Sequence, residues 1–271
     1  MSALPQASGV GEDDENAAAS SRVGSGPSAG LAVAEAVRAR KPFIVFGPPW
    51  RSIETAGFTD APVNVPGLEE NLDGLVAVGR SLTPADKQEL ATVHEAGHAV
   101  LYRLCGVEVT GVRITLGQAA RHLVPGDSCG YTRYEQDEGH RIEHLVAGHL
   151  AGGVAAEVHL ARIGRAEPSN LLLAQLGAAS DHSRLLDFRG PVPLVFSYGP
   201  PLPAPDPGLR MVVVEIDPMR EAVAEVLDGW WPVVEDLAGH LLETGQPDLA
   251  RIEAIRPDPA ALAAITRAMP A

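Results

Sequence analysis

Apolar positions recur every three or four residues along one segment, and this spacing predicts the first long helix of the chain. Thr83 is a suitable N-cap, Pro84 fits the first helical position, and Gly106 is a typical helix end. We therefore expect a helix with one buried face between Thr83 and Gly106. The residues on its apolar stripe are Leu90, Val93, Ala96, Gly97, Val100, Leu101 and Leu104.

A second long helix is predicted over residues 136–163. Each glycine of the Gly152-Gly153 pair in its middle costs about 1 kcal/mol relative to alanine. Such a pair is useful where another helix approaches closely, so we expect this helix to pack against the first one. Glu157 lies on the apolar stripe, either as a buried carboxylate that binds a ligating histidine or as a surface acid at its edge.

The remaining helices are shorter or less regular. Residues 168–188 form a third helical region in this interpretation. Asp217, as N-cap before Pro218, predicts the start of a further helix that continues until Gly245. A short helix follows at residues 249–255.

Strands are predicted at residues 107–115 and 129–134, where β-branched and aromatic residues gather. The short apolar run at 43–46 is either a strand or a docking segment, and the run at 212–214 is a further strand candidate. The strand at 129–134 is either purely structural or an edge that pairs with an extended peptide. The predicted fold class is therefore mainly α, with a small β-hairpin or sheet.

Composition divides the chain into three parts. Residues 1–30 are rich in Ser, Gly, Ala and acids, which predicts a disordered tail. Residues 31–80 form an irregular arm, either packed on the main domain or acting as a separate interaction module. Residues 81–265 carry the helical pattern and form the main domain, with a Pro-rich loop at 191–208.

Charge and hydropathy exclude several classes of protein. A net charge of −14 over 271 residues argues against a nucleic-acid-binding surface. No apolar run approaches the roughly 18 residues of a membrane span, and the N-terminus lacks a signal-peptide pattern. We therefore expect a soluble, cytoplasmic protein. The two cysteines, Cys105 and Cys129, predict no disulfide framework.

Candidate chemistry lies in the middle of the first predicted helix. Residues 94–98 form an H-E-x-x-H motif. His94 and His98 are four apart, so both lie on one helical face and can bind one metal ion. Glu95 lies beside them, where it can take a proton from a metal-bound water. This combination is typical of zinc-dependent peptidases.

A catalytic zinc ion usually takes three protein ligands, and the motif supplies two. No histidine follows at the spacing of the extended H-E-x-x-H-x-x-G-x-x-H motif, so the third ligand must be more distant. The residues alone leave several candidates for it. They are Asp181, Glu157, His149, His159, His182 and Asp187.

Three segments together resemble the FtsH-type zinc proteases. HEAGHA at residues 94–99 is similar to the peptidase motif of that family. LAGGVAAE at 150–157 resembles its L-x-G-G-x-x-A-E segment, and GAASD at 177–181 resembles its G-A-x-x-D segment. The resemblance covers residues 81 to 256 approximately, and three motifs in the right order are more specific than the first alone.

This resemblance implies a role for each matched position. His94, His98 and Asp181 would bind zinc, and Glu95 would be the catalytic base. Glu157 would be either a carboxylate that contacts the ligands or a structural residue. The implied fold is a helical, zincin-like peptidase domain.

The departures from the family are also informative. FtsH-type proteases carry a membrane anchor and an ATPase module, whereas this sequence has two lysines and no phosphate-binding G-x-x-x-x-G-K-[ST] loop. We therefore expect a zinc metalloendopeptidase without its own ATPase. Its partners would be a peptide or unfolded protein substrate, a separate ATPase, and further copies of the chain in a homo-oligomer. One alternative is a catalytically silent zinc-binding regulatory or adaptor protein, and another is a different zinc hydrolase on a similar scaffold.

Overall fold

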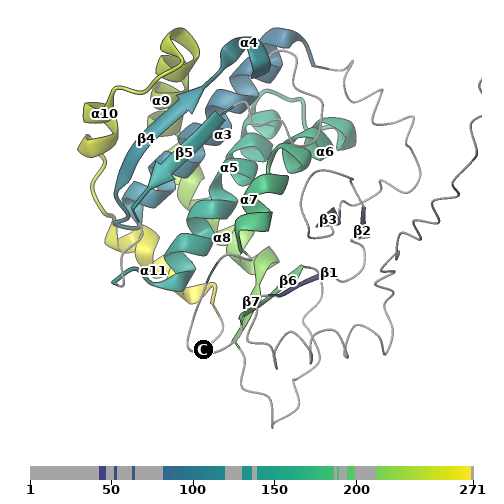
Figure 1. The fold of residues 1–271 in the computed structure, drawn as a ribbon, viewed down its shortest axis with the longest axis vertical. Helices are drawn as coiled ribbons and strands as arrows, with labels where there is room; N and C mark the ends of the chain where they lie inside the picture. The colour runs from purple at the N-terminus through teal and green to yellow at the C-terminus, as the bar shows by residue number, and fades with distance from the viewer. Residues whose placement is uncertain are drawn as a thin grey trace, which may run out of the picture.

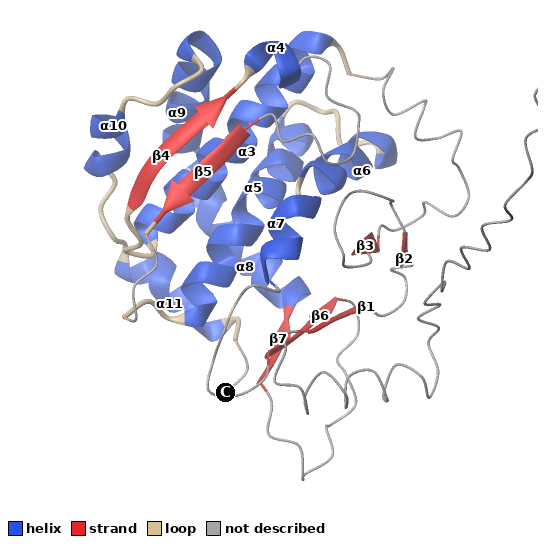
Figure 2. Cartoon of the chain, in the orientation of Figure 1, coloured by secondary structure: helices blue, strands red, loops and turns tan. Residues whose placement is uncertain are grey.

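The computed structural model of the chain describes nine stretches of residues: 43–46, 52–53, 63–64, 82–119, 130–135, 139–185, 188, 194–198 and 212–269. The tail expected at 1–30 lies outside them, as do most of the arm at 31–80 and most of the loop at 191–208. The described part is mainly helical and includes a two-stranded antiparallel sheet (Figure 2). The predicted fold class is confirmed at that level.

Helix α3 (Pro84–Leu104) has the predicted ends. The Thr83 hydroxyl accepts a hydrogen bond from the N–H of Asp86 at 3.2 Å, and the Asp86 carboxylate accepts one from the N–H of Thr83 at 2.8 Å. This reciprocal cap satisfies two backbone donors near the helix start. Gly106 follows the helix with a φ of 79°, a left-handed conformation that glycine adopts without strain.

Helix α5 (Ile142–Arg162) is shorter than the segment predicted at 136–163. It begins at Ile142, the first residue of the apolar stripe, whereas residues 139–141 precede it as a turn. Those polar residues have no apolar side chain to bury against a neighbouring helix. Packing therefore sets the helix start where the stripe begins.

Helices α3 and α5 run side by side, and small residues line their contact. A Cβ atom added to Gly97 would lie 2.5 Å from the Cβ of Ala155 and 2.8 Å from the carbonyl oxygen of Ala151. A Cβ added to Gly148 would overlap the ring of Tyr102. These separations are too short for real carbon contacts. The close approach of the two helices that the sequence predicted is therefore confirmed.

Helices α6 (Pro168–Gly177) and α7 (Ala179–Arg184) occupy the third predicted helical region. A turn at Ala178 separates them, and its N–H reaches the carbonyl of Ala174 at 3.1 Å. This turn changes the direction of the chain and brings α7 against α5 (Figure 1).

The single helix predicted between Asp217 and Gly245 is wrong. Two helices, α8 (Ile216–Gly229) and α9 (Trp231–Thr244), occupy this stretch and meet at Trp230. The second residue of α9, Pro232, suits the first turn of a new helix but would disrupt the interior of a continuous one.

The predicted N-cap of this segment is also wrong. Glu215 is the N-cap of α8, so Asp217 lies inside the first turn. The reason is that strand β7 (Val212–Glu215) runs directly into the helix and leaves no loop between the two elements.

The C-terminal region contains one more helix than predicted. Gly245, with a φ of 69°, ends α9 as expected, and α10 (Leu249–Ala254) matches the predicted short helix. The additional helix is α11 (Pro259–Arg267). Its cap is Asp258, whose side chain accepts a hydrogen bond from the N–H of Ala260 at 2.9 Å.

Strands β4 (Val109–Ile114) and β5 (Gly130–Tyr134) form an antiparallel pair in which Arg113 is opposite Tyr131. The short helix α4 (Leu116–Ala119) follows β4. Both strands contact α3, and Figure 1 shows the pair alongside that helix. The two strands predicted here are confirmed, and their placement beside α3 matters for the site.

A second sheet consists of parallel strands in the order β1-β6-β7. Strands β1 (Phe43–Phe46) and β7 were predicted, whereas β6 (Leu194–Tyr198) lies in the stretch expected to be a Pro-rich loop. One of its neighbours in the sheet, β1, is far away in sequence, and flanking prolines hide its strand pattern. The remaining pair of strands is β2 (Ser52–Ile53) with β3 (Val63–Asn64).

The main hydrophobic core surrounds α3. It joins residues of α3, α5, α8 and α9 with others from β4, β5 and the C-terminal helices. Among its largest fully buried side chains are Trp231, Tyr102 and Phe196. Helix α3 is therefore a fixed support for the polar residues in its middle turns.

Candidate metal centre

Helix α3 carries three of the predicted site residues in its middle turns. His94 and His98 are one turn apart, so their side chains leave the helix on the same face. Their Nε2 atoms are 3.1 Å apart. Glu95 is buried and contacts strand β5. The helix thus places two imidazoles and one carboxylate in a small region.

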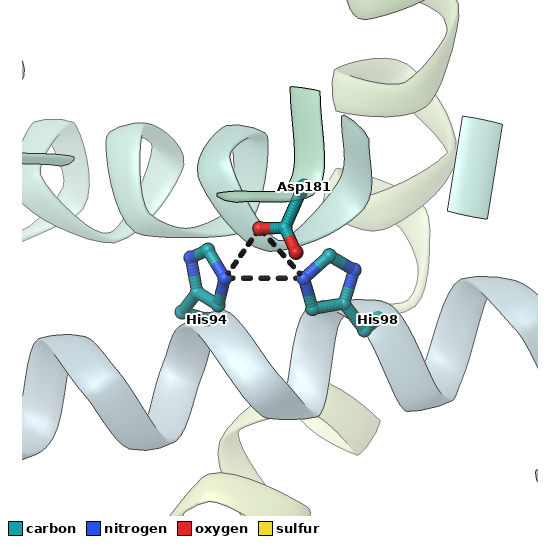
Figure 3. A group of neighbouring side chains, drawn as sticks. All are labelled: His94, His98 and Asp181. Atoms are coloured by element: carbon teal, nitrogen blue, oxygen red, sulfur yellow. Dashed lines mark hydrogen bonds and ion pairs between the residues drawn. The ribbon is translucent and has the colours of Figure 1, made fainter. Parts of the chain in front are cut away.

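Helix α7 supplies a second carboxylate to the same place. The Oδ2 atom of Asp181 lies 3.0 Å from Nε2 of His94 and 3.3 Å from Nε2 of His98. Figure 3 shows the three side chains pointing toward one another, with Asp181 opposite the two histidines. Their donor atoms all lie within 4.8 Å of one another. Two nitrogens and one oxygen of the kinds that bind zinc therefore converge at one point.

The orientation of His98 is fixed from behind. Its Nδ1 lies 2.7 Å from the carbonyl oxygen of Gly148 on α5, so Nδ1 carries the hydrogen and donates it. A neutral imidazole in this tautomer has its lone pair on Nε2, which points at His94 and Asp181. Metal-binding histidines commonly show this arrangement, with a backbone carbonyl bound to the second nitrogen.

Glycine at position 152 keeps the meeting point of the donor atoms clear of side chains. A Cβ atom added there would lie 2.6 Å from Nε2 of His94 and would overlap Nε2 of His98. The backbone of α5 therefore passes directly beside these nitrogens. A glycine cradle of this kind fits a small bound ion, because any side chain at Gly152 would take up its position.

The neighbouring glycine serves the other half of the site. A Cβ atom added to Gly153 would lie 2.8 Å from the Cβ of Ala178, in the turn that precedes α7. Because the two residues meet closely, α7 can bring Asp181 within reach of the histidines. The two glycines thus make separate contacts. Gly152 lies against the histidines of α3, and Gly153 lies against the turn that precedes α7.

The negative charge of Asp181 favours a positive charge where its carboxylate meets the imidazoles of His94 and His98. Burial alone lowers the pKa of His98, but the negative charge and hydrogen bond of Asp181 outweigh it and raise that pKa to about 9. Burial raises the pKa of Asp181, yet the two histidines hold it well below its usual range. A metal cation would balance the negative charge of Asp181 in the same way. A histidine binds metal as neutral imidazole, so metal binding would release the proton that His98 otherwise holds.

Strand β5 holds the carboxylate of Glu95. The hydroxyl of Thr132 donates a hydrogen bond to Oε2 of Glu95 at 2.7 Å. A Cβ atom added to Gly130 would lie 2.7 Å from the other oxygen, Oε1. Burial raises the pKa of Glu95, although the nearby histidines and the Thr132 hydroxyl counteract part of that rise. A buried carboxylate with a raised pKa is a suitable acceptor of a proton.

Glu157 has a different partner from the ligating histidine that we considered. Both of its oxygens accept hydrogen bonds from Arg220 of α8, at 2.7 and 2.6 Å. The arginine on α8 thus neutralises the Glu157 carboxylate on α5. The sequence pattern of α5 alone does not reveal this pairing. Glu157 fits the structural role and does not belong to the converging group.

The other candidates for a third ligand lie elsewhere. His149 is hydrogen-bonded to the hydroxyl of Tyr134 at 2.9 Å, and burial lowers its pKa to about 3. His159 lies 3.6 Å from Glu89. His182 is buried, and burial together with the charge of Arg220 lowers its pKa to about 4. The converging group contains none of these three, and Asp187 lies outside the described residues.

Two features of the site were missed from the sequence. Thr132 binds Glu95 across 37 positions of sequence, and the Gly148 carbonyl binds His98 across 50. The alternation of Gly130 and Thr132 on one face of a predicted strand was a usable signal. Its position over Glu95 depends on long-range packing, which one sequence does not display.

Comparison with known proteins leaves the chain without an assigned family. In the part of the chain that the structure describes, no helix has the length and apolar character needed to cross a membrane. The chain matches no family model, no curated protein and no solved structure. The resemblance to FtsH-type peptidases therefore stays a prediction that rests on the three sequence motifs.

Proposed function

We propose that this chain is a zinc-dependent metallopeptidase of helical, zincin-like architecture. The observation that carries the proposal is the convergence of His94, His98 and Asp181 from two helices, beside the buried carboxylate of Glu95. Two histidines four apart with a glutamate after the first are the arrangement of zinc peptidases. The resemblance of three sequence motifs to those of FtsH-type proteases supports the same proposal.

Zinc is the metal that suits these ligands best. Two imidazoles and one carboxylate are a usual set for catalytic zinc, which keeps a fourth position for water or substrate. The side chains of His94 and Asp181 retain exposures of 14% and 15%, so solvent reaches the site. A bound zinc ion would lower the pKa of a water ligand to about 7 and polarise the scissile carbonyl.

The remaining steps, metal binding and proton transfer, are assigned to residues of the chain. His94, His98 and Asp181 would hold the ion, with His98 kept in orientation by the carbonyl of Gly148. Glu95 would accept a proton from the attacking water and then deliver it to the leaving amine. Its burial beside β5 keeps competing bulk water away from the carboxylate.

The proposed substrates are peptides or unfolded protein segments, supplied alone or by a separate ATPase. The competing function is a metal-binding regulatory protein without turnover. The contact between Thr132 and Glu95 favours the peptidase, because a regulator needs no positioned base beside its metal.

The test is cleavage of casein and of a fluorogenic peptide by the purified, zinc-loaded chain. We expect a chelator to abolish cleavage and added zinc to restore it. Glu95→Gln should keep the zinc content of the wild type and lower kcat by about 100- to 10,000-fold, the usual contribution of a general base. Zinc content is measured in the same samples by elemental analysis.

A matched control is Glu89→Gln, which makes the same substitution on the same helix at an exposed position. It should leave both zinc content and kcat close to those of the wild type. Full activity in Glu95→Gln would remove this mechanism. Stoichiometric zinc without any cleavage in the wild type would favour the regulatory function.

A further inference from the structure

Three alternate residues of strand β5 face inward, toward the candidate site. Gly130, Thr132 and Tyr134 are partly buried, whereas Tyr131 and Arg133 between them are exposed. This alternation is the normal consequence of the strand repeat, in which successive side chains point to opposite faces. The inward face of β5 therefore lies against α3 and α5, and each of its three residues makes a contact near the site.

The first two contacts enclose the carboxylate of Glu95. The Thr132 hydroxyl lies 2.7 Å from Oε2, and it also lies 3.3 Å from the backbone carbonyl of the same residue. Gly130 faces Oε1, where an added Cβ would lie 2.7 Å from this oxygen and 2.9 Å from Cγ. Glycine thus lets the strand approach one side of the carboxylate while threonine binds the other.

The third contact fixes the strand itself. The hydroxyl of Tyr134 and Nε2 of His149 on α5 are 2.9 Å apart, and the ring of Tyr134 stacks on that of Tyr102 with centroids 4.4 Å apart. His149 directly follows Gly148, whose carbonyl orients His98. The same stretch of α5 therefore holds both a ligand of the proposed metal and the strand that holds Glu95.

We propose that Thr132 is a positioning residue for Glu95. Its hydroxyl holds Oε2 and thereby fixes the orientation of the carboxylate that would exchange a proton with the reacting water. The proposal deepens the peptidase function and rests on it for its effect on turnover.

The chemistry of the two side chains explains why a contact of this kind is needed. The terminal torsion of a glutamate is broad, so an unbound carboxylate samples many orientations. Threonine is β-branched and stiff at χ1, so a hydroxyl on a strand stays in place. A hydrogen bond from this hydroxyl to a charged oxygen is among the stronger ones. Thr132 therefore fixes the orientation of Glu95 before substrate arrives, which is the form of preorganisation that raises kcat.

The first experiment compares three variants on the zinc-loaded chain. Thr132→Val removes the hydroxyl and keeps the shape, Thr132→Ser keeps the hydroxyl, and Thr110→Val is a matched control at an exposed position on β4. We expect Thr132→Val to lower kcat by about 10- to 100-fold, the scale of a misplaced catalytic group, with little change in KM. Zinc content should be unchanged. Thr132→Ser should recover most of kcat, and Thr110→Val should match the wild type.

Two results of this experiment would overturn the proposal. One is a kcat in Thr132→Val close to that of the wild type. The other is a loss of kcat that Thr132→Ser shares, since a hydroxyl-specific role requires rescue by serine.

A second experiment does not depend on peptidase activity. The melting temperatures of Thr132→Val, Glu95→Ala and the double variant form a double-mutant cycle. If the hydroxyl binds the carboxylate, Thr132→Val lowers the melting temperature by several degrees in the wild type and by less in the Glu95→Ala background. Additive shifts would show that the two side chains do not interact and would overturn the proposal. Coupled shifts in a chain without any cleavage would instead sink the proposed function and leave the contact intact.

Discussion

Two of the helices that contact α3, namely α5 and α9, differ in the size of the residues that they place against it. Helix α5 offers Gly148, Gly152 and Ala155, which lie so close to α3 that an added methyl group at either glycine would overlap its side chains. Helix α9 instead buries larger residues, including Leu237 and Leu241, in the core that it shares with α3. The two contacts therefore differ in how closely the helix backbones approach and in how much apolar surface each residue buries.

The small residues of α5 let its backbone come within contact distance of side chains on α3. The Gly148 carbonyl reaches His98, and the α5 backbone at Gly152 passes beside both histidines. Such a contact buries little apolar area for each residue. Large residues contribute more, at about 25 cal/mol for each Å² of apolar surface removed from water. We infer that the contact with α5 shapes the site, while the contact with α9 mainly stabilises the fold.

The largest expected effect is on stability and comes from the α9 side. Leu241 is fully buried, so Leu241→Ala should lower the free energy of unfolding by about 2–5 kcal/mol. Denaturant unfolding with a fixed zinc concentration measures this loss. The zinc affinity of the folded variant, measured by competition with a chromophoric chelator, should remain near that of the wild type. A loss of zinc affinity in Leu241→Ala would show that the contact with α9 also shapes the site, and would contradict the proposed difference between the two contacts.

The next effect belongs to the α5 side and concerns the metal. In Gly152→Ala the new methyl group would displace both imidazoles from the point where they meet Asp181. We expect zinc affinity to fall by about 10- to 100-fold, the usual result of disturbing the surroundings of a metal ligand. The same chelator competition measures it. Wild-type zinc affinity in this variant would show that the glycine cradle has no role in metal binding.

Local signals made much of this fold predictable from the sequence. Thr83, Pro84 and Gly106 give the limits of α3, because caps and left-handed glycines depend on neighbours within a few residues. The Gly152-Gly153 pair predicted a close helix contact for a similar reason, since glycine in a helix is costly unless something approaches it. Strands β4 and β5 followed from their residue types.

Features that depend on distant partners were not predictable in this way. Strand β6 exists through parallel pairing with β1 and β7, and Glu157 is neutralised by Arg220 from another helix. Of the candidate site, the motif located His94, Glu95 and His98. Six candidates remained for the third ligand until a family resemblance favoured Asp181, and the structure places its carboxylate beside both histidines.

The smallest expected effect uses the same substitution on the α9 side. Gly239 is exposed in the interior of α9, and an added Cβ would meet nothing within 4 Å. Gly239→Ala should therefore raise the free energy of unfolding by about 0.5–1 kcal/mol, the gain in helix propensity, with unchanged zinc affinity. Denaturant unfolding and the chelator competition measure the two quantities. Opposite outcomes for Gly152→Ala and Gly239→Ala would show that glycine is needed in α5 for contact with the ligands and not as a general feature of these helices. A loss of stability in Gly239→Ala would mean that α9 also depends on a close contact at its glycine, and the contrast between the two helices would fail.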